Sequence, residues 1–332
     1  MRRRAKHNLK KGFLVAGKRR TVVKNPLGGR GSTLRALKDS DKSSICIIRS
    51  VGGIGDVLMI TPALRELKLR YPKSKLTFAV DRHTTSGDNY YELVKNAPFI
   101  DHIIDARNVV HANYRHTTDI SAVCIPYERV DLPPVNRIDL FANYLGMASL
   151  KDRRPFYRVE PSEKAQALDF VGDKTGKLIF ISVGSMEGKR CWSQELNDKW
   201  PELVSSLSQR IPGVRFIVND FTGKAPILKT YKNVIYLEQT SIRELAALIS
   251  ISDHFVGPDS GPMHMAGALG VPSTVIFGSI PPEARINHYP NHTGVRLNSL
   301  PCIGCWYKAC PYDVKCMRDL GIRLVANQVL GK

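Results

Sequence analysis

The stretch from Asp259 to Gly270 contains residues that can hold a phosphate group. A short apolar run ends at Pro258, and the loop Asp259-Ser260-Gly261 follows it. Pro262 then begins a helix of small residues that also carries His264, because proline at the first helical position sacrifices no intrahelical hydrogen bond. Backbone N–H groups of the loop and of the helix N-terminus point to one spot, which favours phosphate. Ordinary strand–helix–strand units share this pattern, so a purely structural role also fits it.

A second candidate phosphate site follows the apolar run at residues 178–183. Ser185 lies in a turn of small residues, and Lys189 and Arg190 come next. A hydroxyl and a cation at the end of a strand can hold a phosphate together. Either Lys189 or Arg190 fits the role of the cation.

Asp56 is a candidate for acid–base chemistry. It stands where a predicted helix begins, after a loop in which Gly53 and Gly55 would let a substrate approach the backbone. The loop lacks the third glycine of a dinucleotide fingerprint. The carboxylate could accept a proton, or it could only complement the helix dipole. Pro62 predicts a kink or a restart of this helix, with Thr61 as its cap.

Four cysteines near the C-terminus could bind a metal ion. They are spaced C-x2-C-x4-C-x5-C, and four thiols this close in sequence can surround one tetrahedral ion. The spacing departs from that of a zinc ribbon, so structural zinc is a tentative prediction beside an iron–sulfur cluster and free or paired thiols. The residues are Cys302, Cys305, Cys310 and Cys316.

Two long motifs resemble the lipopolysaccharide heptosyltransferase family. The run GPDSGPMHMAGALGVPSTVIFG, residues 257–278, is similar to its donor-site signature. The run GIGDVLMITPALRELKLRYP, residues 53–72, is similar to a motif near its N-terminus. The resemblance extends over roughly residues 45 to 320. It implies an α/β protein of the GT-B type, with two Rossmann-like parallel-sheet domains facing each other across a cleft.

The resemblance also implies roles for the residues described above. The enzyme would invert the anomeric configuration of a sugar taken from a nucleotide diphosphate, without a catalytic metal. Asp56 would be the general base for the acceptor, and the default acceptor is the lipopolysaccharide core. The usual proline after Trp192 is replaced by serine, which leaves the choice between Lys189 and Arg190 open. The donor would be held by Ser185, Lys189, Arg190, Asp259, Ser260, Gly261 and His264.

Strand and helix patterns alternate along the chain, which predicts parallel sheets. In the first half, strands are expected at residues 45–51, 76–80, 100–105 and 119–126, and helices at 90–95 and 137–145. In the second half, strands are expected at 178–183, 216–219, 234–237 and 273–277. Glu238 follows one of these strands and is a candidate partner for the nucleotide ribose. Residues 241–244 form a capping box at the start of a helix.

Four parts are predicted from these patterns. A basic N-terminal arm covers residues 1–44, an acceptor domain covers 45–155, a donor domain covers 156–300, and a cysteine-rich segment and tail cover 301–332. The protein carries a formal net charge of +19, and the arm supplies +12 of it. Such an arm suits a polyanion, either nucleic acid or the phosphates of lipopolysaccharide, although a solvated tail fits as well.

The composition favours a cytoplasmic protein. Seven cysteines in a long, charged chain suggest a reducing compartment, and no membrane span or secretory signal is expected. Contact with the surface of the inner membrane remains compatible with a lipopolysaccharide acceptor. Two alternatives stay open beside the heptosyltransferase-like enzyme. One is a glycosyltransferase that modifies DNA, and the other is a non-catalytic nucleic-acid-binding protein with a zinc module.

Overall fold

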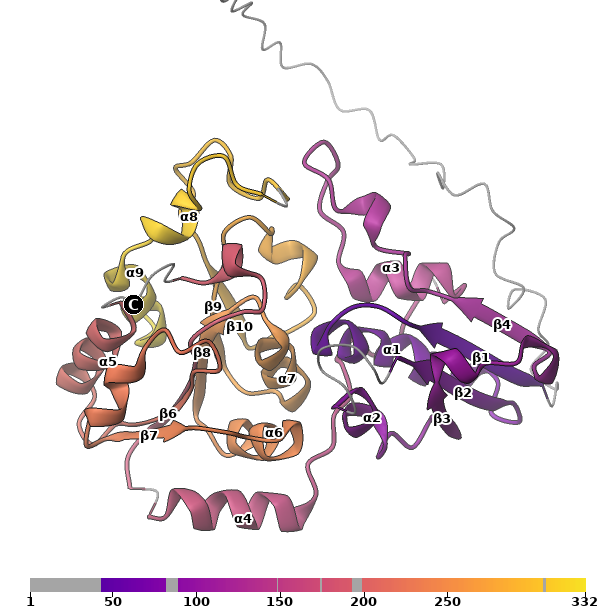
Figure 1. The fold of residues 1–332 in the computed structure, drawn as a ribbon, viewed down its shortest axis with the longest axis horizontal. Helices are drawn as coiled ribbons and strands as arrows, with labels where there is room; N and C mark the ends of the chain where they lie inside the picture. Colours follow the sequence, from indigo (N-terminus) through magenta and orange to yellow (C-terminus); the bar gives the residue numbers. More distant parts are fainter. Residues whose placement is uncertain (1–42, 82–88, 148, 174, 193–198, 307–308) are drawn as a thin grey trace, which may run out of the picture. The chain divides into compact units, whose positions relative to one another are not determined.

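The computed structural model describes residues 43–332 apart from 82–88, 148, 174, 193–198 and 307–308. The described residues belong to one compact unit, which contains two parallel sheets with helices packed on them (Figure 1). The predicted α/β class with two parallel-sheet halves is therefore confirmed. The basic arm predicted at residues 1–44 lies outside the described residues, except for its last two. The predicted boundaries between the parts stay predictions.

The first sheet has the strand order β3-β2-β1-β4, and all its pairs are parallel. Its strands are β1 (Ser44–Arg49), β2 (Lys75–Val80), β3 (His102–Asp105) and β4 (His116–Asp119). The helices of this half are α1 (Ile54–Arg70), α2 (Asn89–Val94) and α3 (Arg137–Tyr144). Strands β1 and β2 are almost wholly buried, as expected for a parallel sheet that is covered on both faces.

The second sheet has the order β10-β9-β8-β5-β6-β7 and is also parallel throughout. Its strands are β5 (Leu178–Ser182), β6 (Arg215–Asn219), β7 (Val234–Leu237), β8 (His254–Pro258), β9 (Ser273–Ile276) and β10 (His292–Val295). The helices of this half are α4 (Pro161–Val171), α5 (Lys199–Arg210), α6 (Ile242–Ser250), α7 (Gly261–Leu269), α8 (Lys315–Arg318) and α9 (Ile322–Val329).

In each sheet the strand order changes direction at one strand, so that successive strands are added first on one side of it and then on the other. In the first sheet β1 has β2 on one side and β4 on the other, and in the second sheet β5 lies between β6 and β8. Ligands of open α/β sheets bind at the carboxyl ends of the strands at such a reversal. The first turn of α1, which follows β1, carries Asp56, and the loops after β5 and β8 carry Ser185 and Asp259, so the topology brings the predicted site residues to these two points.

The strand expected at residues 119–126 is wrong. Strand β4 ends at Asp119, and residues Ile125–Tyr127 form a 3-10 helix. Arg49 accounts for the difference, because its Nη1 donates to the carbonyl oxygens of Ile120 (2.9 Å) and Ser121 (2.8 Å). These carbonyls are satisfied by a side chain, so the chain turns away from the sheet at this point.

The restart expected at Pro62 is also wrong, since α1 runs from Ile54 to Arg70 with Pro62 inside it. Proline cannot donate a hydrogen bond to the carbonyl of Leu58, four residues before it. The hydroxyl of Thr61 donates to that carbonyl instead, at 2.7 Å, and accepts a hydrogen bond from the backbone N–H of Phe156. Thr61 thus satisfies a backbone carbonyl inside the helix and is not a cap residue.

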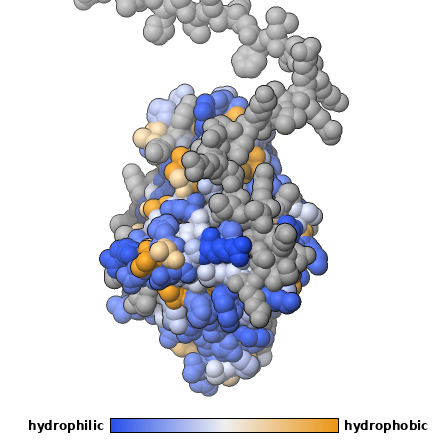
Figure 2. Space-filling view, turned by 90° about the vertical axis from the view of Figure 1, so that its right-hand side faces the viewer, coloured by the Kyte–Doolittle hydropathy of each residue, from blue (hydrophilic) through white to orange (hydrophobic). Residues whose placement is uncertain are grey.

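Within the described ranges, no helix is both long enough and apolar enough to cross a bilayer. Figure 2 views the molecule from the right-hand side of Figure 1, and the described residues on this face are mainly hydrophilic with scattered apolar side chains.

Candidate active site

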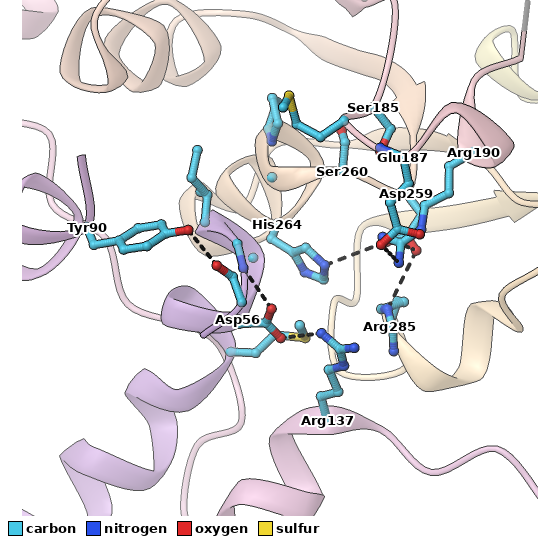
Figure 3. A pocket seen from close by; sticks show the side chains of 18 of the residues that line it. Asp56, Tyr90, Arg137, Ser185, Glu187, Arg190, Asp259, Ser260, His264 and Arg285 are labelled. Carbon is cyan, nitrogen blue, oxygen red and sulfur yellow. Dashed lines mark hydrogen bonds and ion pairs between the residues drawn. The ribbon is translucent and has the colours of Figure 1, made fainter. Parts of the chain in front are cut away.

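A cavity of about 590 Å³ lies where the two reversal points meet. Its lining comes from the loops after β1, β5 and β8, from the N-terminus of α3, and from the segment after β9. Figure 3 shows the side chains that face it. Of the predicted site residues, the lining includes Gly53, Gly55, Asp56, Ser185, Arg190, Asp259, Ser260, Gly261 and His264.

Asp56 lies in the first turn of α1 and is buried. Its Oδ2 accepts the backbone N–H of Gly53 at 2.9 Å, and its Oδ1 is bonded to Nη1 of Arg137 and lies 3.4 Å from Nη2 of Arg49. Burial alone would raise the pKa of this carboxyl, but Arg137, Arg49 and the Gly53 N–H outweigh burial and hold the pKa well below its usual range. Asp56 is therefore an ionised carboxylate between two arginines.

Arg137 belongs to a series of ion pairs in which positive and negative side chains alternate. Its Nε donates to Oε1 of Glu128 at 2.7 Å, and its Nη2 is bonded to the same oxygen. Nη2 of Arg285 lies 3.3 Å from that oxygen, and Nε of Arg285 lies 3.6 Å from Asp259. The series thus links the carboxylate of Asp56 in the first half to that of Asp259 in the second.

Asp259 lies close to three basic side chains of the second half. Its Oδ2 lies 3.3 Å from Nη1 of Arg190 and 3.6 Å from Nε of Arg285, and its Oδ1 lies 3.8 Å from Nε2 of His264. Burial would raise the pKa of this carboxyl, but Arg190 and Arg285 lower it below its usual value. The residue is only 2% exposed, so its carboxylate contacts neighbouring side chains rather than bulk solvent.

His264 is a neutral imidazole between the two halves. Burial lowers its pKa to about 3, despite the opposing effect of Asp259. Its Nδ1 is 2.7 Å from the hydroxyl of Tyr289, which fixes the ring. A Cβ at Gly55 would come within 2.3 Å of the ring, so the glycine allows α1 to approach α7 closely.

The N-terminus of α7 opens onto the cavity. Ser260 is its N-cap residue but makes no side-chain cap bond, and among the described residues its buried Oγ has no hydrogen-bond partner. Gly261 follows and lies against Ile54 at the N-terminus of α1, where an added Cβ would be 2.9 Å from Ile54 Cβ. A hydroxyl and a helix N-terminus without other partners suit an anion.

The loop after β5 presents one of its two cations to the cavity. Ser185 is buried, and the thiol of Cys191 lies 3.4 Å from both its backbone N and its O, which holds the turn. Arg190 lines the cavity and reaches Asp259. Lys189 pairs with Glu187 at 3.3 Å and is not among the described residues that line the cavity.

Comparison with known proteins identifies the family of the chain. Residues 122–315, more than half of the chain, match the model of glycosyltransferase family 9 (heptosyltransferase). The chain belongs to glycosyltransferase family 9. The lipooligosaccharide heptosyltransferase 2 of Campylobacter jejuni subsp. jejuni serotype O:2 is 33% identical over 92 residues, which is 27% of this chain and 28% of that protein. The match thus spans less than a third of the length of this curated relative.

Solved structures share the family 9 fold. The Escherichia coli ADP-heptose lipopolysaccharide heptosyltransferase II is 15% identical with a TM-score of 0.61, over 87% of this chain and 98% of that one. The iron-containing dodecameric glycosyltransferase TibC of enterotoxigenic E. coli H10407 is 17% identical with a TM-score of 0.64, over 89% of this chain and 76% of that one. At these identities the likeness establishes the fold, which is the GT-B arrangement expected from the sequence.

Glu238 lies apart from the main cavity of this family 9 protein. Its side chain is 72% exposed and is paired with Lys229. It lines a second cavity of about 600 Å³ between α4, α6 and the end of β7, and Thr240 lines both cavities. Its predicted contact with a nucleotide ribose stays a prediction.

In the described part of the chain, the four cysteines of the C-terminal segment are not joined by disulfide bonds. Burial, together with the thiols of Cys305, Cys310 and Cys302, raises the pKa of Cys316 to about 11, so the four thiols influence one another. Within the described part of the chain, no three side chains of His, Cys, Asp or Glu are arranged to hold a metal ion. The thiols are thus grouped without forming the tetrahedral arrangement expected from the sequence, and metal binding stays a prediction.

Five charged residues that line the cavity escaped the sequence-based prediction: Arg49, Glu128, Arg137, Glu187 and Arg285. Arg49 ends a strand, Arg137 begins a helix, and the other three lie in loops, where arginine and glutamate are ordinary surface residues. Only the burial of Arg285, which is 1% exposed and stacked over Trp306 at 5.2 Å, distinguishes it from a surface cation, and burial is not visible in the sequence.

Proposed function

We propose that this protein is an inverting glycosyltransferase that moves a sugar from a nucleotide diphosphate to an anionic acceptor. The observation that carries the proposal is the pairing of two groups in one cavity. A carboxylate of the first half, Asp56, faces a helix N-terminus and an arginine of the second half. One side suits a proton acceptor for the attacking hydroxyl, and the other suits a diphosphate leaving group.

The donor diphosphate would bind at the N-terminus of α7. Backbone N–H groups there, the free hydroxyl of Ser260 and the guanidinium of Arg190 supply hydrogen bonds and positive charge. Ser185 adds a second hydroxyl from the loop after β5. Asp259 would keep Arg190 and Arg285 in position. These groups would stabilise the charge that develops on the diphosphate as it leaves, which takes the place of a catalytic metal.

The reaction would proceed in one displacement. Asp56 accepts the proton of an acceptor hydroxyl, whose oxygen forms a bond to the anomeric carbon of the donor. The bond from that carbon to the diphosphate breaks, and its electron pair leaves with the nucleoside diphosphate. The anomeric configuration inverts because the two oxygens lie on opposite faces of the sugar.

ADP-heptose is the first donor to test. It is named in the description of the E. coli heptosyltransferase II, and a TibC structure was determined in complex with ADP-D-β-D-heptose. The corresponding acceptor would be a lipopolysaccharide or lipooligosaccharide core, at the cytoplasmic surface of the inner membrane. Because of the basic arm, duplex DNA is a second candidate acceptor. A nucleic-acid-binding protein without catalytic activity is the alternative to an enzyme.

A structural metal at the four cysteines completes the proposal. Thiolates suit zinc, and they also suit iron, which TibC contains by its description. Cys302, Cys305, Cys310 and Cys316 would hold the ion and tie the C-terminal segment together, at a place outside the lining of the catalytic cavity. Elemental analysis of the purified protein distinguishes zinc, iron and metal-free thiols.

The substitution Asp56→Asn tests the enzymatic proposal. Transfer from ADP-heptose to a truncated lipopolysaccharide should fall by roughly 10²- to 10⁴-fold, because the general base is lost. Affinity for the donor should stay nearly unchanged, since the diphosphate binds on the other half. Transfer at the wild-type rate would remove Asp56 from the mechanism. A wild-type protein that neither transfers nor hydrolyses any nucleotide sugar but binds DNA would support the non-catalytic alternative.

A further inference from the structure

The pairing of Asp56 with Arg137 conflicts with the role of a general base. A carboxylate that two guanidinium groups stabilise has little tendency to accept a proton, because the ideal base has a pKa close to the working pH. The two arginines are nevertheless held very differently, and this difference indicates how the conflict could be resolved.

Arg49 is fixed in place. Its Nη1 donates to the carbonyl oxygens of Ile120 and Ser121, and its guanidinium lies 5.2 Å from the centre of the Phe141 ring. It therefore remains near Asp56 whatever binds in the cavity.

Arg137 is held by carboxylates. Its Nε and Nη2 both donate hydrogen bonds to one oxygen of Glu128, while Nη1 alone is bonded to Asp56. Both Arg137 and Asp56 line the cavity. An anion that approaches Nη1 can thus replace Asp56 while the contact with Glu128 serves as a pivot, and arginine forms strong paired bonds with carboxylates and phosphates.

Resting on the proposed function, we propose that an anionic group of the acceptor takes Arg137 away from Asp56 and thereby turns Asp56 into an effective base. The ion pair exchanges one anion for another, so no charge is left unpaired. The acceptor hydroxyl then loses its proton to Asp56. In the absence of acceptor, the Arg137–Asp56 pair keeps the carboxylate from activating water, which would otherwise hydrolyse the donor.

The pH–rate profile also depends on the other titratable groups around Asp56. Glu128 lies beyond Arg137, and Arg285 is an arginine, which stays protonated. Burial lowers the pKa of His264 to about 3 and raises the pKa of Cys124 to about 12, so both stay neutral near neutral pH. Arg137 is bonded to Glu128 as well as to Asp56, so a change in the acid limb of the pH–rate profile reports these two carboxylates together, and the acceptor preference and the donor hydrolysis distinguish Asp56 from Glu128.

The test uses the full chain, ADP-heptose, and two acceptors. One acceptor is lipopolysaccharide truncated in its inner core, and the other is the same material after removal of its phosphates and methylation of its carboxylates. The wild-type protein should show a lower kcat on the neutralised acceptor as well as a higher KM, with kcat/KM reduced roughly 10- to 100-fold. An equal kcat on both acceptors would overturn the inference.

The variant Arg137→Gln gives the second measurement. Its preference for the charged acceptor should disappear, its release of ADP without acceptor should rise several-fold relative to transfer, and its acid limb should move to higher pH. Arg137→Lys, which keeps the charge, should restore part of the preference. Arg154→Gln, which breaks an exposed pair with Asp152, is the matched control and should behave as wild type.

The outcomes separate the two proposals. A variant Arg137→Gln that keeps the wild-type preference and shows no added hydrolysis overturns the exchange at Arg137 while transfer still supports the enzyme. Failure of that variant to fold leaves the wild-type comparison of the two acceptors decisive. Absence of transfer and of donor hydrolysis by the wild-type protein would refute the proposed function, and the inference with it.

Discussion

Lys189 and Arg190 are adjacent cations, but the folded chain separates their environments. Arg190 lines the cavity and contacts Asp259, while Lys189 pairs with Glu187. We therefore expect Arg190→Ala to weaken the binding of ADP-heptose by roughly 10- to 100-fold, because it removes a charge-assisted contact with the diphosphate. It should also lower the rate of transfer, since the charge on the diphosphate grows as it leaves.

Lys189→Ala is the matched control, and it should change the donor affinity less than Arg190→Ala does. Isothermal titration with ADP-heptose measures both variants under the same conditions. The reverse order of the two effects would assign the phosphate contact to Lys189 and would contradict the structure-based choice.

A motif that surrounds a residue indicates where in the fold that residue lies. Ser260 and Asp56 follow strands and begin helices, so local pattern and strand order together bring them to one cavity. Arg137 and Arg285 carry no such local signal. Their place in the site depends on contacts between segments far apart in the chain, such as the 157 positions between Glu128 and Arg285.

At the scale of elements, glycines allow the N-termini of α1 and α7 to pack closely against each other. Gly55 is in α1, where alanine would ordinarily favour the helix by about 1 kcal/mol. Here a Cβ would come within 2.3 Å of the buried ring of His264, which Tyr289 holds in place. Such overpacking costs about 1–3 kcal/mol, so the clash should outweigh the gain in helix propensity.

Gly55→Ala should therefore lower the Tm by roughly 2–6 °C. Gly188→Ala adds the same methyl group at a glycine whose Cβ would meet nothing within 4 Å, and its Tm should stay close to that of wild type. Differential scanning fluorimetry compares the three proteins. A Gly55→Ala protein at least as stable as wild type would show that the two helices are free to move apart.

Elements also show where sequence patterns mislead. The apolar residues after Asp119 have the composition of a strand, but the carbonyls of Ile120 and Ser121 bond to Arg49 instead of to a neighbouring strand. Pro62 has the signature of a helix break, but the hydroxyl of Thr61 replaces the missing donor. In both cases a side chain satisfies a backbone carbonyl, and propensity does not anticipate such a bond.

At the scale of the whole molecule, one buried and two partly buried histidines make stability depend on pH. Burial lowers the pKa of His254 and His292 to about 4 and that of His264 to about 3. The unfolded chain protonates its histidines near pH 6.5, so below that pH it binds more protons than the folded chain and gains stability relative to it. Stability should thus fall between pH 6.5 and 4, before lowered carboxyl pKa values contribute further loss at lower pH.

Each histidine should cost up to about 1–2 kcal/mol at pH 5 relative to pH 7.5. Urea unfolding at the two pH values measures the difference. The variant His254→Asn should reduce the pH dependence, and the same substitution at the exposed His111 is the matched control. Equal stability at pH 7.5 and pH 5 would contradict the assignment of these three histidines as neutral.

The basic arm can be tested apart from the catalytic unit. The first described strand begins at Ser44, and the carbonyl of Ser43 accepts a hydrogen bond from Lys75, so a deletion of residues 1–40 leaves the sheet intact. The deletion removes 13 lysines and arginines and one aspartate. Folding and hydrolysis of ADP-heptose should survive, because the cavity is built from residue 49 onward.

What the deletion should change is binding to an anionic acceptor. Each cation seated on a phosphate releases a counterion, so the contribution of the arm should decrease steeply with salt. Full-length and truncated proteins are compared for binding to duplex DNA and to lipopolysaccharide at two salt concentrations. Loss on lipopolysaccharide alone supports the core acceptor, and loss on DNA alone supports a nucleic-acid acceptor. Unchanged binding to both would show that the arm takes no part in acceptor recognition, and a truncated protein that does not fold would refute the predicted boundary at residue 44.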